Sequence, residues 1–108
     1  MSAAFVNQLR ARGDVVRMAS AGATTITVRV EVPEVWDVVR IAASPDDSVR
    51  ALKERTLAIL FPQGDGPECF VMKLRGFEVL EESMSLAAVG AVDGSIFLLT
   101  HRNRRPVR

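Results

Sequence analysis

Cysteine and histidine are almost missing from this sequence: Cys69 and His101 are the only ones among its 108 residues. A single cysteine excludes an internal disulfide framework, and it excludes a zinc or iron–sulfur site with four cysteine ligands from one chain. The same scarcity is typical of a protein of the reducing cytoplasm, where we expect this one. We therefore predict no metal and no other cofactor.

The sequence also has little excess charge and no long apolar run. Fourteen Lys and Arg residues nearly balance thirteen Asp and Glu residues, so the formal net charge is +1. That balance gives no global attraction to nucleic acid or acidic membranes, and an electrostatic partner would need a local patch. No apolar run is long enough to span a bilayer, and the first residues lack the pattern of a signal peptide. Hydrophobic residues at 48% and charged residues at 25% are ordinary for one globular domain.

Residues 1–23 differ from the rest of the chain and are predicted to be an N-terminal extension. Phe5, Val6 and Leu9 have the spacing of a short amphipathic helix, which Gly13 would end. Ala, Ser and Gly dominate residues 19–23, which is typical of a linker.

Residues 24–43 predict a β-hairpin. In "TTITVRVEV" (24–32), apolar β-branched residues alternate with polar ones, which indicates a half-buried strand. Pro33–Glu34 then supplies a turn, and "VWDVVRIAA" (35–43) is the second strand.

Residues 44–61 form the strongest helix pattern in the chain. Ser44 is the expected N-cap and Pro45 the first helical residue. Asp47 completes a Ser-x-x-Asp motif that is similar to a capping box. Apolar residues follow helical spacing on one face, and Pro62 ends the run. The opposite face, which we expect to be in water, carries Arg50, Lys53 and Glu54.

Three further strands are predicted after the helix, at 69–76, 77–80 and 96–101, with a glycine-containing corner at 85–95. The order of elements favours an α+β, β-grasp fold. We expect a mixed sheet of four to five strands with one main helix packed on one face, and the last strand parallel to the first. The predicted core comprises Ile26, Val28, Val30, Val39, Ile41, Val49, Leu52, Thr56, Met72, Leu74, Leu86, Phe97 and Leu99.

Over residues 24–102 the chain resembles ubiquitin-like proteins. The resemblance rests on the hairpin-to-helix block "TITVRVEVPEVWDVVRIAASPDDSVRALKER", the strand "FVMKLRG", the corner "SLAAVGAVDGS" and the closing "IFLLTHR". Among bacterial relatives it is similar to the YukD/EsaB-like proteins associated with type VII secretion. The resemblance implies a noncovalent protein-interaction module, an accessory factor of a bacterial secretion or multiprotein system.

One departure from this family pattern bears on function. Conjugated modifiers and the ThiS- and MoaD-type sulfur carriers end in Gly-Gly, which passes into an activating site without side-chain clash. Here no glycine follows Gly94, so the alternative of a covalent modifier or sulfur carrier is disfavoured. A second alternative is an anionic-surface binder that acts through the basic tail, residues 103–108 together with the preceding arginine. The tail arginines are Arg102, Arg104, Arg105 and Arg108.

No pattern in the sequence predicts catalysis. No motif joins Cys69 to His101, and we interpret the cysteine as a small buried residue and the histidine as a surface residue at a strand end. "GDGPE" (64–68) lacks the Lys-Ser/Thr of a phosphate loop, and adjacent Glu81 and Glu82 are typical of a solvated loop. We therefore expect a protein that is not an enzyme.

The candidate site is the sheet face opposite the helix, since ubiquitin's main recognition patch occupies the corresponding face. Strand alternation predicts an apolar centre with a basic rim there. The residues assigned to it are Trp36, Val38, Arg40, Val71, Lys73, Ile96, Leu98 and Thr100. A protein partner is expected, with two alternatives: the N-terminal segment folds over this face, or the face is a homo-oligomer contact. Neither specific nucleic-acid binding nor membrane insertion is expected. The basic tail is predicted to speed encounter with an acidic protein surface.

Overall fold

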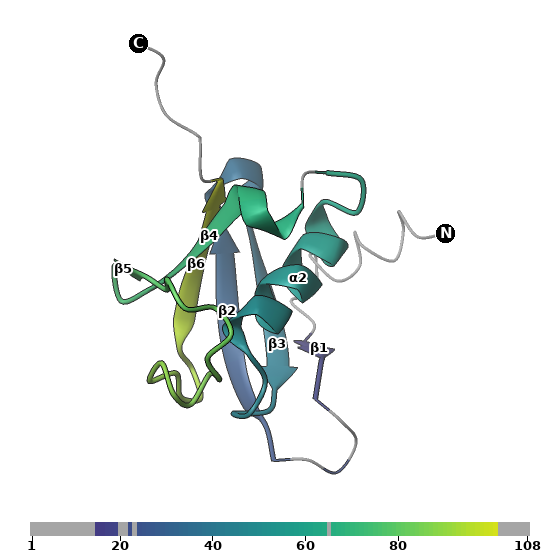
Figure 1. The fold of residues 1–108 in the computed structure, drawn as a ribbon. Coiled ribbons are helices and arrows are strands. Elements are labelled where there is room, and N and C mark those ends of the chain that lie inside the picture. The colour runs from purple at the N-terminus through teal and green to yellow at the C-terminus, as the bar shows by residue number, and fades with distance from the viewer. Residues whose placement is uncertain (1–14, 20–21, 23, 65, 102–108) are drawn as a thin grey trace.

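The computed structural model describes residues 15–19, 22, 24–64 and 66–101, and within them a mixed sheet packs one face against a single α-helix (Figure 1). The helix is α2 (Val49–Leu60), and two short 3-10 turns are η1 (Pro33–Val35) and η2 (Pro67–Cys69). The strands are β1 (Val15–Arg17), β2 (Ile26–Val32), β3 (Asp37–Ala43), β4 (Phe70–Leu74), β5 (Phe77–Glu78) and β6 (Ile96–His101).

The six strands lie in the order β1-β3-β2-β6-β4-β5. The predicted α+β architecture with one main helix is therefore confirmed. The sheet has one strand more than expected, because β1 adds to its edge parallel to β3. The predicted helix around Phe5, Val6 and Leu9, with its end at Gly13, lies outside the described residues. The same holds for the tail arginines at 102, 104, 105 and 108.

The hairpin of β2 and β3 is antiparallel from Ile26↔Ala43 to Val32↔Asp37, as the alternating pattern predicted. Proline's fixed φ suits the first residue of η1, which makes the connection. Trp36 closes the turn in the left-handed region, with φ 54° and ψ 44°.

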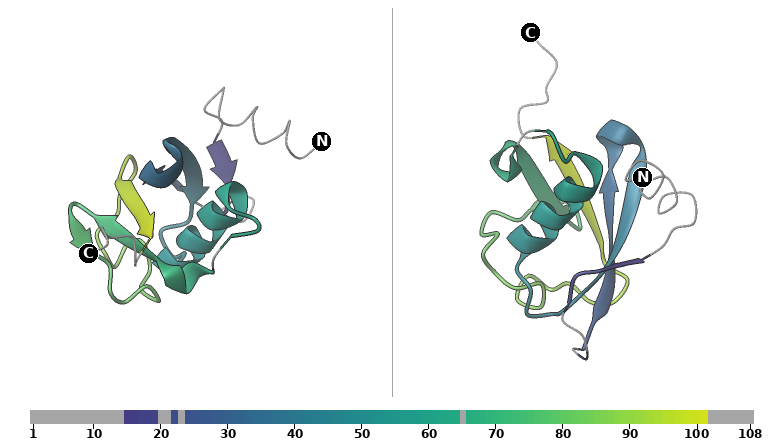
Figure 2. Two further views of the ribbon diagram at one scale, coloured as in Figure 1. Left: turned by 90° about the horizontal axis from the view of Figure 1, so that it is seen from above. Right: turned by 90° about the vertical axis from the view of Figure 1, so that its right-hand side faces the viewer.

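The last described strand lies in the middle of the sheet. β6 runs parallel to β2, with Val30 opposite Phe97, and antiparallel to β4, with Met72 opposite Leu99. This confirms the expected pairing of the last predicted strand with the first, and Figure 2 shows α2 on one side of these strands.

The helix begins later than predicted. Ser48, not Ser44, is the N-cap: its Oγ accepts a hydrogen bond from the Ala51 N–H at 3.0 Å. Ser44 and Asp47 instead form a separate turn, in which Asp47 Oδ2 accepts from the Ser44 N–H at 2.9 Å. Two serines four residues apart can each cap a backbone N–H, and the chain uses both before α2 starts.

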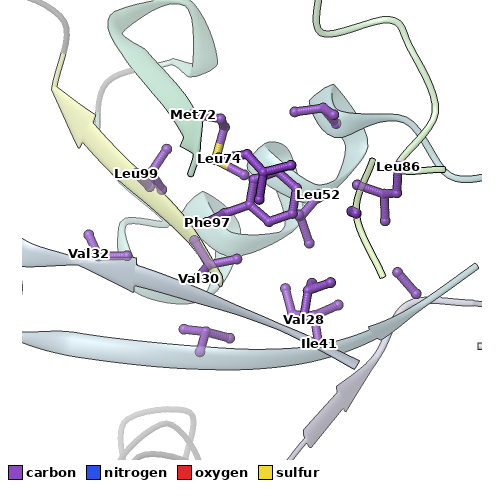
Figure 3. Close-up of a cluster of buried hydrophobic side chains, with 14 of the residues drawn as sticks. Val28, Val30, Val32, Ile41, Leu52, Met72, Leu74, Leu86, Phe97 and Leu99 are labelled. Carbon is purple, nitrogen blue, oxygen red and sulfur yellow. The ribbon is translucent and has the colours of Figure 1, made fainter. Parts of the chain in front are cut away.

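The core fills the space between α2 and the sheet (Figure 3). Every predicted core residue is buried except Ile26, which packs against the cluster and is partly buried. Buried residues that the prediction missed are Ala19, Val32, Ala43, Lys53, Leu57, Phe70, Val71 and Ala91. None of the helices in the described part of the chain has the length and apolar character needed to cross a membrane.

The prediction that Lys53 faces water is wrong. The residue is 1% exposed, and its ammonium lies 2.6 Å from Glu82 Oε1 and 2.8 Å from Oε2. The ammonium also donates to the Phe70 carbonyl oxygen at 2.9 Å. A lysine can be buried when its charge is paired and hydrogen-bonded, and here a carboxylate from a distant loop meets that condition.

Candidate protein-binding surface

The face of the sheet turned away from α2 is built by strand alternation. In β2, Val28, Val30 and Val32 are buried, whereas Arg29 between them is exposed. We call the face that carries Arg29, turned away from α2, the outer face. Its members are Val15, Arg17, Thr27, Arg29, Glu31, Val38, Arg40, Ala42, Val71, Lys73, Glu78, Ile96, Leu98 and Thr100.

Strand register fixes the neighbours of each outer-face residue. Leu98 lies opposite Glu31 on β2 and opposite Lys73 on β4. Val38 lies opposite Glu31 on the other side of β2, so a charged residue separates it from Leu98. The apolar side chains therefore run as a column along β6, with charged side chains on both flanks.

The second apolar residue of that column is Ile96, which lies opposite Arg29. Arg29 lies opposite Arg40 on β3, so two cations sit side by side on this face. Over the six strands this face carries four cations, Arg17, Arg29, Arg40 and Lys73, and two acids, Glu31 and Glu78, and Glu78 lies opposite Lys73. Cations therefore outnumber acids here, but both signs are present, and Arg17, Arg29, Glu31 and Glu78 lie beside the residues assigned from sequence.

Exposure differs strongly among the predicted site residues. Ile96 and Val38 are 44% and 40% exposed, while Leu98, Lys73 and Thr100 are half-buried. Val71 is only 7% exposed, so its assignment as a contact residue is wrong. A valine side chain is short, and Thr100 opposite and Lys73 two residues on flank it, so little of it remains accessible.

Trp36 lies at the tip of the β2–β3 hairpin and is 94% exposed. The tip is tied to the sheet because Glu34 Oε2 accepts a hydrogen bond from the His101 N–H at 3.0 Å. The Trp36 N–H donates to the Pro33 carbonyl oxygen at 3.1 Å. An exposed tryptophan on an anchored turn is the type of residue that contributes most to protein interfaces.

The residues considered for catalysis, Cys69, His101, Glu81 and Glu82, lie apart from one another or take part in packing and ion pairing. The His101 ring packs edge-on against Phe70, with centroids 5.0 Å apart, and Cys69 ends the turn η2, partly buried. Glu82 binds Lys53, whereas Glu81 is exposed. Within the described ranges, no three His, Cys, Asp or Glu side chains come together as a metal site would require.

Neither a family model nor a curated protein matches the chain. Solved structures do match it. The ubiquitin-like domain of the Arabidopsis thaliana protein At2g32350 superposes with a TM-score of 0.63 at 16% identity, over 82% of this chain and 89% of that chain. A ubiquitin from Caldiarchaeum subterraneum gives 0.65 at 15% identity, over 77% and 100%. The N-terminal ubiquitin-like domain of the 4931431F19Rik protein gives 0.63 at 18% identity, over 84% and 88%. Together with the sheet order and the single helix, these likenesses establish that this chain has a ubiquitin-like fold.

Proposed function

We propose that this chain is a noncovalent protein-interaction module whose partner docks on the outer face of the sheet. The observation that carries the proposal is the apolar column of Ile96 and Leu98, which is flanked by charged residues of both signs, together with the exposed Trp36 on the hairpin turn. An apolar centre with a charged border is the usual anatomy of a protein interface.

The surrounding charges favour a partner with acidic groups around an apolar anchor. Arg29 and Arg40 lie opposite each other, so a partner carboxylate placed beside them would meet two cations. Lys73, on the other flank of Leu98, lies opposite Glu78 of this chain, so the Arg29–Arg40 side is where an acidic group of the partner is favoured most. Such charges mainly steer encounter and fix orientation, while the apolar contacts supply most of the affinity.

The same proposal includes the narrower expectations drawn from the sequence. They are a cytoplasmic location, no enzymatic activity, and a role as accessory factor of a bacterial secretion or multiprotein system. The resemblance to YukD/EsaB-like proteins supports the last of these, and the single cysteine supports the first.

Site-specific photocrosslinking in the native host tests the proposal. A photoreactive residue at Ile96 is expected to form one discrete adduct with another protein, which mass spectrometry identifies. Adding Leu98→Asp should abolish that adduct, because a buried carboxylate would face the apolar anchor of the partner.

Leu80→Asp is the matched control, since Leu80 is 82% exposed and lies beyond β5 at the edge of the sheet. Thermal unfolding of both variants shows whether the fold is kept. If the adduct persists in a folded Leu98→Asp protein, the partner does not dock on the outer face.

A further inference from the structure

A second apolar surface lies at the edge of the sheet and adjoins the outer face at Glu78. A groove of about 500 Å³ runs along β5 and the loop that follows it. Its apolar lining includes Phe77, Leu80, Met84 and Val89, and Phe77 and Leu80 are 77% and 82% exposed. Several large apolar side chains gathered at one exposed groove indicate a contact surface.

The groove is held in shape by hydrogen bonds from both of its sides. The Val49 N–H donates to the Met84 carbonyl oxygen at 3.0 Å, and the Arg50 N–H donates to the Glu82 carbonyl oxygen at 2.8 Å. On the other side, Arg75 Nη2 donates to the Gly90 carbonyl oxygen at 3.1 Å. A preformed groove loses little entropy when it is occupied.

The N-terminal sequence of this chain has the chemistry that fits the groove. Phe5, Val6 and Leu9 provide an apolar stripe at helical spacing, and Arg10 and Arg12 follow it. The charged residues in the groove lining are two acids, Glu78 and Glu81, and one cation, Arg75, so acids are in excess. Apolar residues followed by cations would thus meet an apolar floor next to carboxylates.

The position of β1 determines which copy of the chain supplies that segment. The segment enters the sheet at Val15 on β1, and β1 and β5 are the opposite ends of the strand order. Five strand spacings of about 4.8 Å place these edges ~24 Å apart. Even a fully extended chain spans at most about 21 Å over the six residue steps from Val15 back to Leu9, which is too short to bring Leu9 into the groove of its own copy.

We propose that the groove beside β5 binds the N-terminal segment, residues 2–12, of a second copy of this chain. Reciprocal exchange of the two segments gives a closed dimer, whereas a one-way contact gives longer chains of copies. The apolar column of Ile96 and Leu98 takes no part in this contact, so self-association and partner binding are separate properties of the molecule.

Sedimentation velocity of the full chain over two decades of concentration tests the inference. The unaltered protein should associate as its concentration rises. Leu80→Asp in the groove and Leu9→Asp in the segment should each weaken association by more than roughly tenfold, because each loses one buried leucine and gains a buried charge. Leu98→Asp on the outer face is the control and should associate like the unaltered protein.

A synthetic peptide of residues 1–14 provides an independent readout. Added to the ¹⁵N-labelled Leu9→Asp protein, it should shift the amide resonances of residues 77–90 and leave those of β2 and β3 unchanged. The inference is overturned if the unaltered protein stays monomeric at every concentration, or if Leu9→Asp associates as well as the unaltered protein. It is also overturned if the peptide shifts the amides of the outer face instead.

Discussion

The buried Lys53–Glu82 pair makes a sharp prediction about stability. The Lys53 ammonium has three acceptors, two carboxylate oxygens at 2.6 and 2.8 Å and the Phe70 carbonyl oxygen at 2.9 Å. The lysine side chain is 2% exposed and the glutamate side chain 13%. The pair joins α2 to the loop after β5, so its loss affects the packing of both.

The two single substitutions should differ in cost. Glu82→Ala leaves a buried ammonium with one acceptor, which should lower the free energy of unfolding by about 3–5 kcal/mol. Lys53→Met keeps the packing of the aliphatic stem. It removes the donor to the Phe70 carbonyl oxygen and to the Glu82 carboxylate, which is 13% exposed and can gain water, so about 1–3 kcal/mol is expected. Against a typical total of about 5–15 kcal/mol, the first loss is large.

The double variant separates the pair interaction from the rest. Lys53→Met with Glu82→Ala should be little less stable than Lys53→Met alone, which gives a coupling free energy of roughly 2–4 kcal/mol. Urea unfolding at neutral pH measures all four corners of the cycle. The exposed pair Arg50–Glu54, also at 2.9 Å, is the control, and Glu54→Ala should cost only about 0.3–0.5 kcal/mol. A Glu82→Ala cost as small as that of Glu54→Ala would refute the reasoning.

Two further predictions concern the core and the helix start. Leu52→Ala and Leu99→Ala, at fully buried positions, should each lower the free energy of unfolding by about 2–5 kcal/mol, whereas Leu80→Ala should change it little. Ser48→Ala should cost about 1 kcal/mol, because the Ala51 N–H loses its acceptor. Chemical denaturation tests each variant, and losses below the error of the assay would contradict the burial of the leucines and the capping role of the serine.

The elements that could be predicted from sequence are those encoded by local patterns. The alternation of β-branched residues in β2 and the apolar stripe of α2 each define a buried face without knowledge of the rest of the chain. The start of α2 was placed wrongly because Ser44 and Ser48 both precede a helical pattern and both can cap. Local sequence offers the two alternatives, and tertiary contacts with residues 82–87 select one.

Features that depend on distant residues could not be predicted. Burial of Lys53 requires Glu82, which is 29 positions further along the chain. Alternation assigns Val71 to a side of the sheet but does not say how far its neighbours cover it. No periodic hydrophobic pattern in the sequence indicates the groove beside β5. Its residues Phe77, Leu80 and Met84 are brought together by the turn and loop that follow β4.

Trp36 provides a test of whether its position serves binding or stability. Its φ of 54° is in the left-handed region, which costs a residue with a bulky side chain about 1 kcal/mol or more, and asparagine tolerates that region better. At 94% exposure the indole buries almost nothing that could offset this cost. Trp36→Asn should therefore raise the free energy of unfolding by roughly 0.5–1 kcal/mol, measured by urea unfolding, while it weakens the crosslink formed from Ile96. If the substitution instead destabilises the fold by more than about 1 kcal/mol, the tryptophan is a structural residue and its exposure is no argument for a partner.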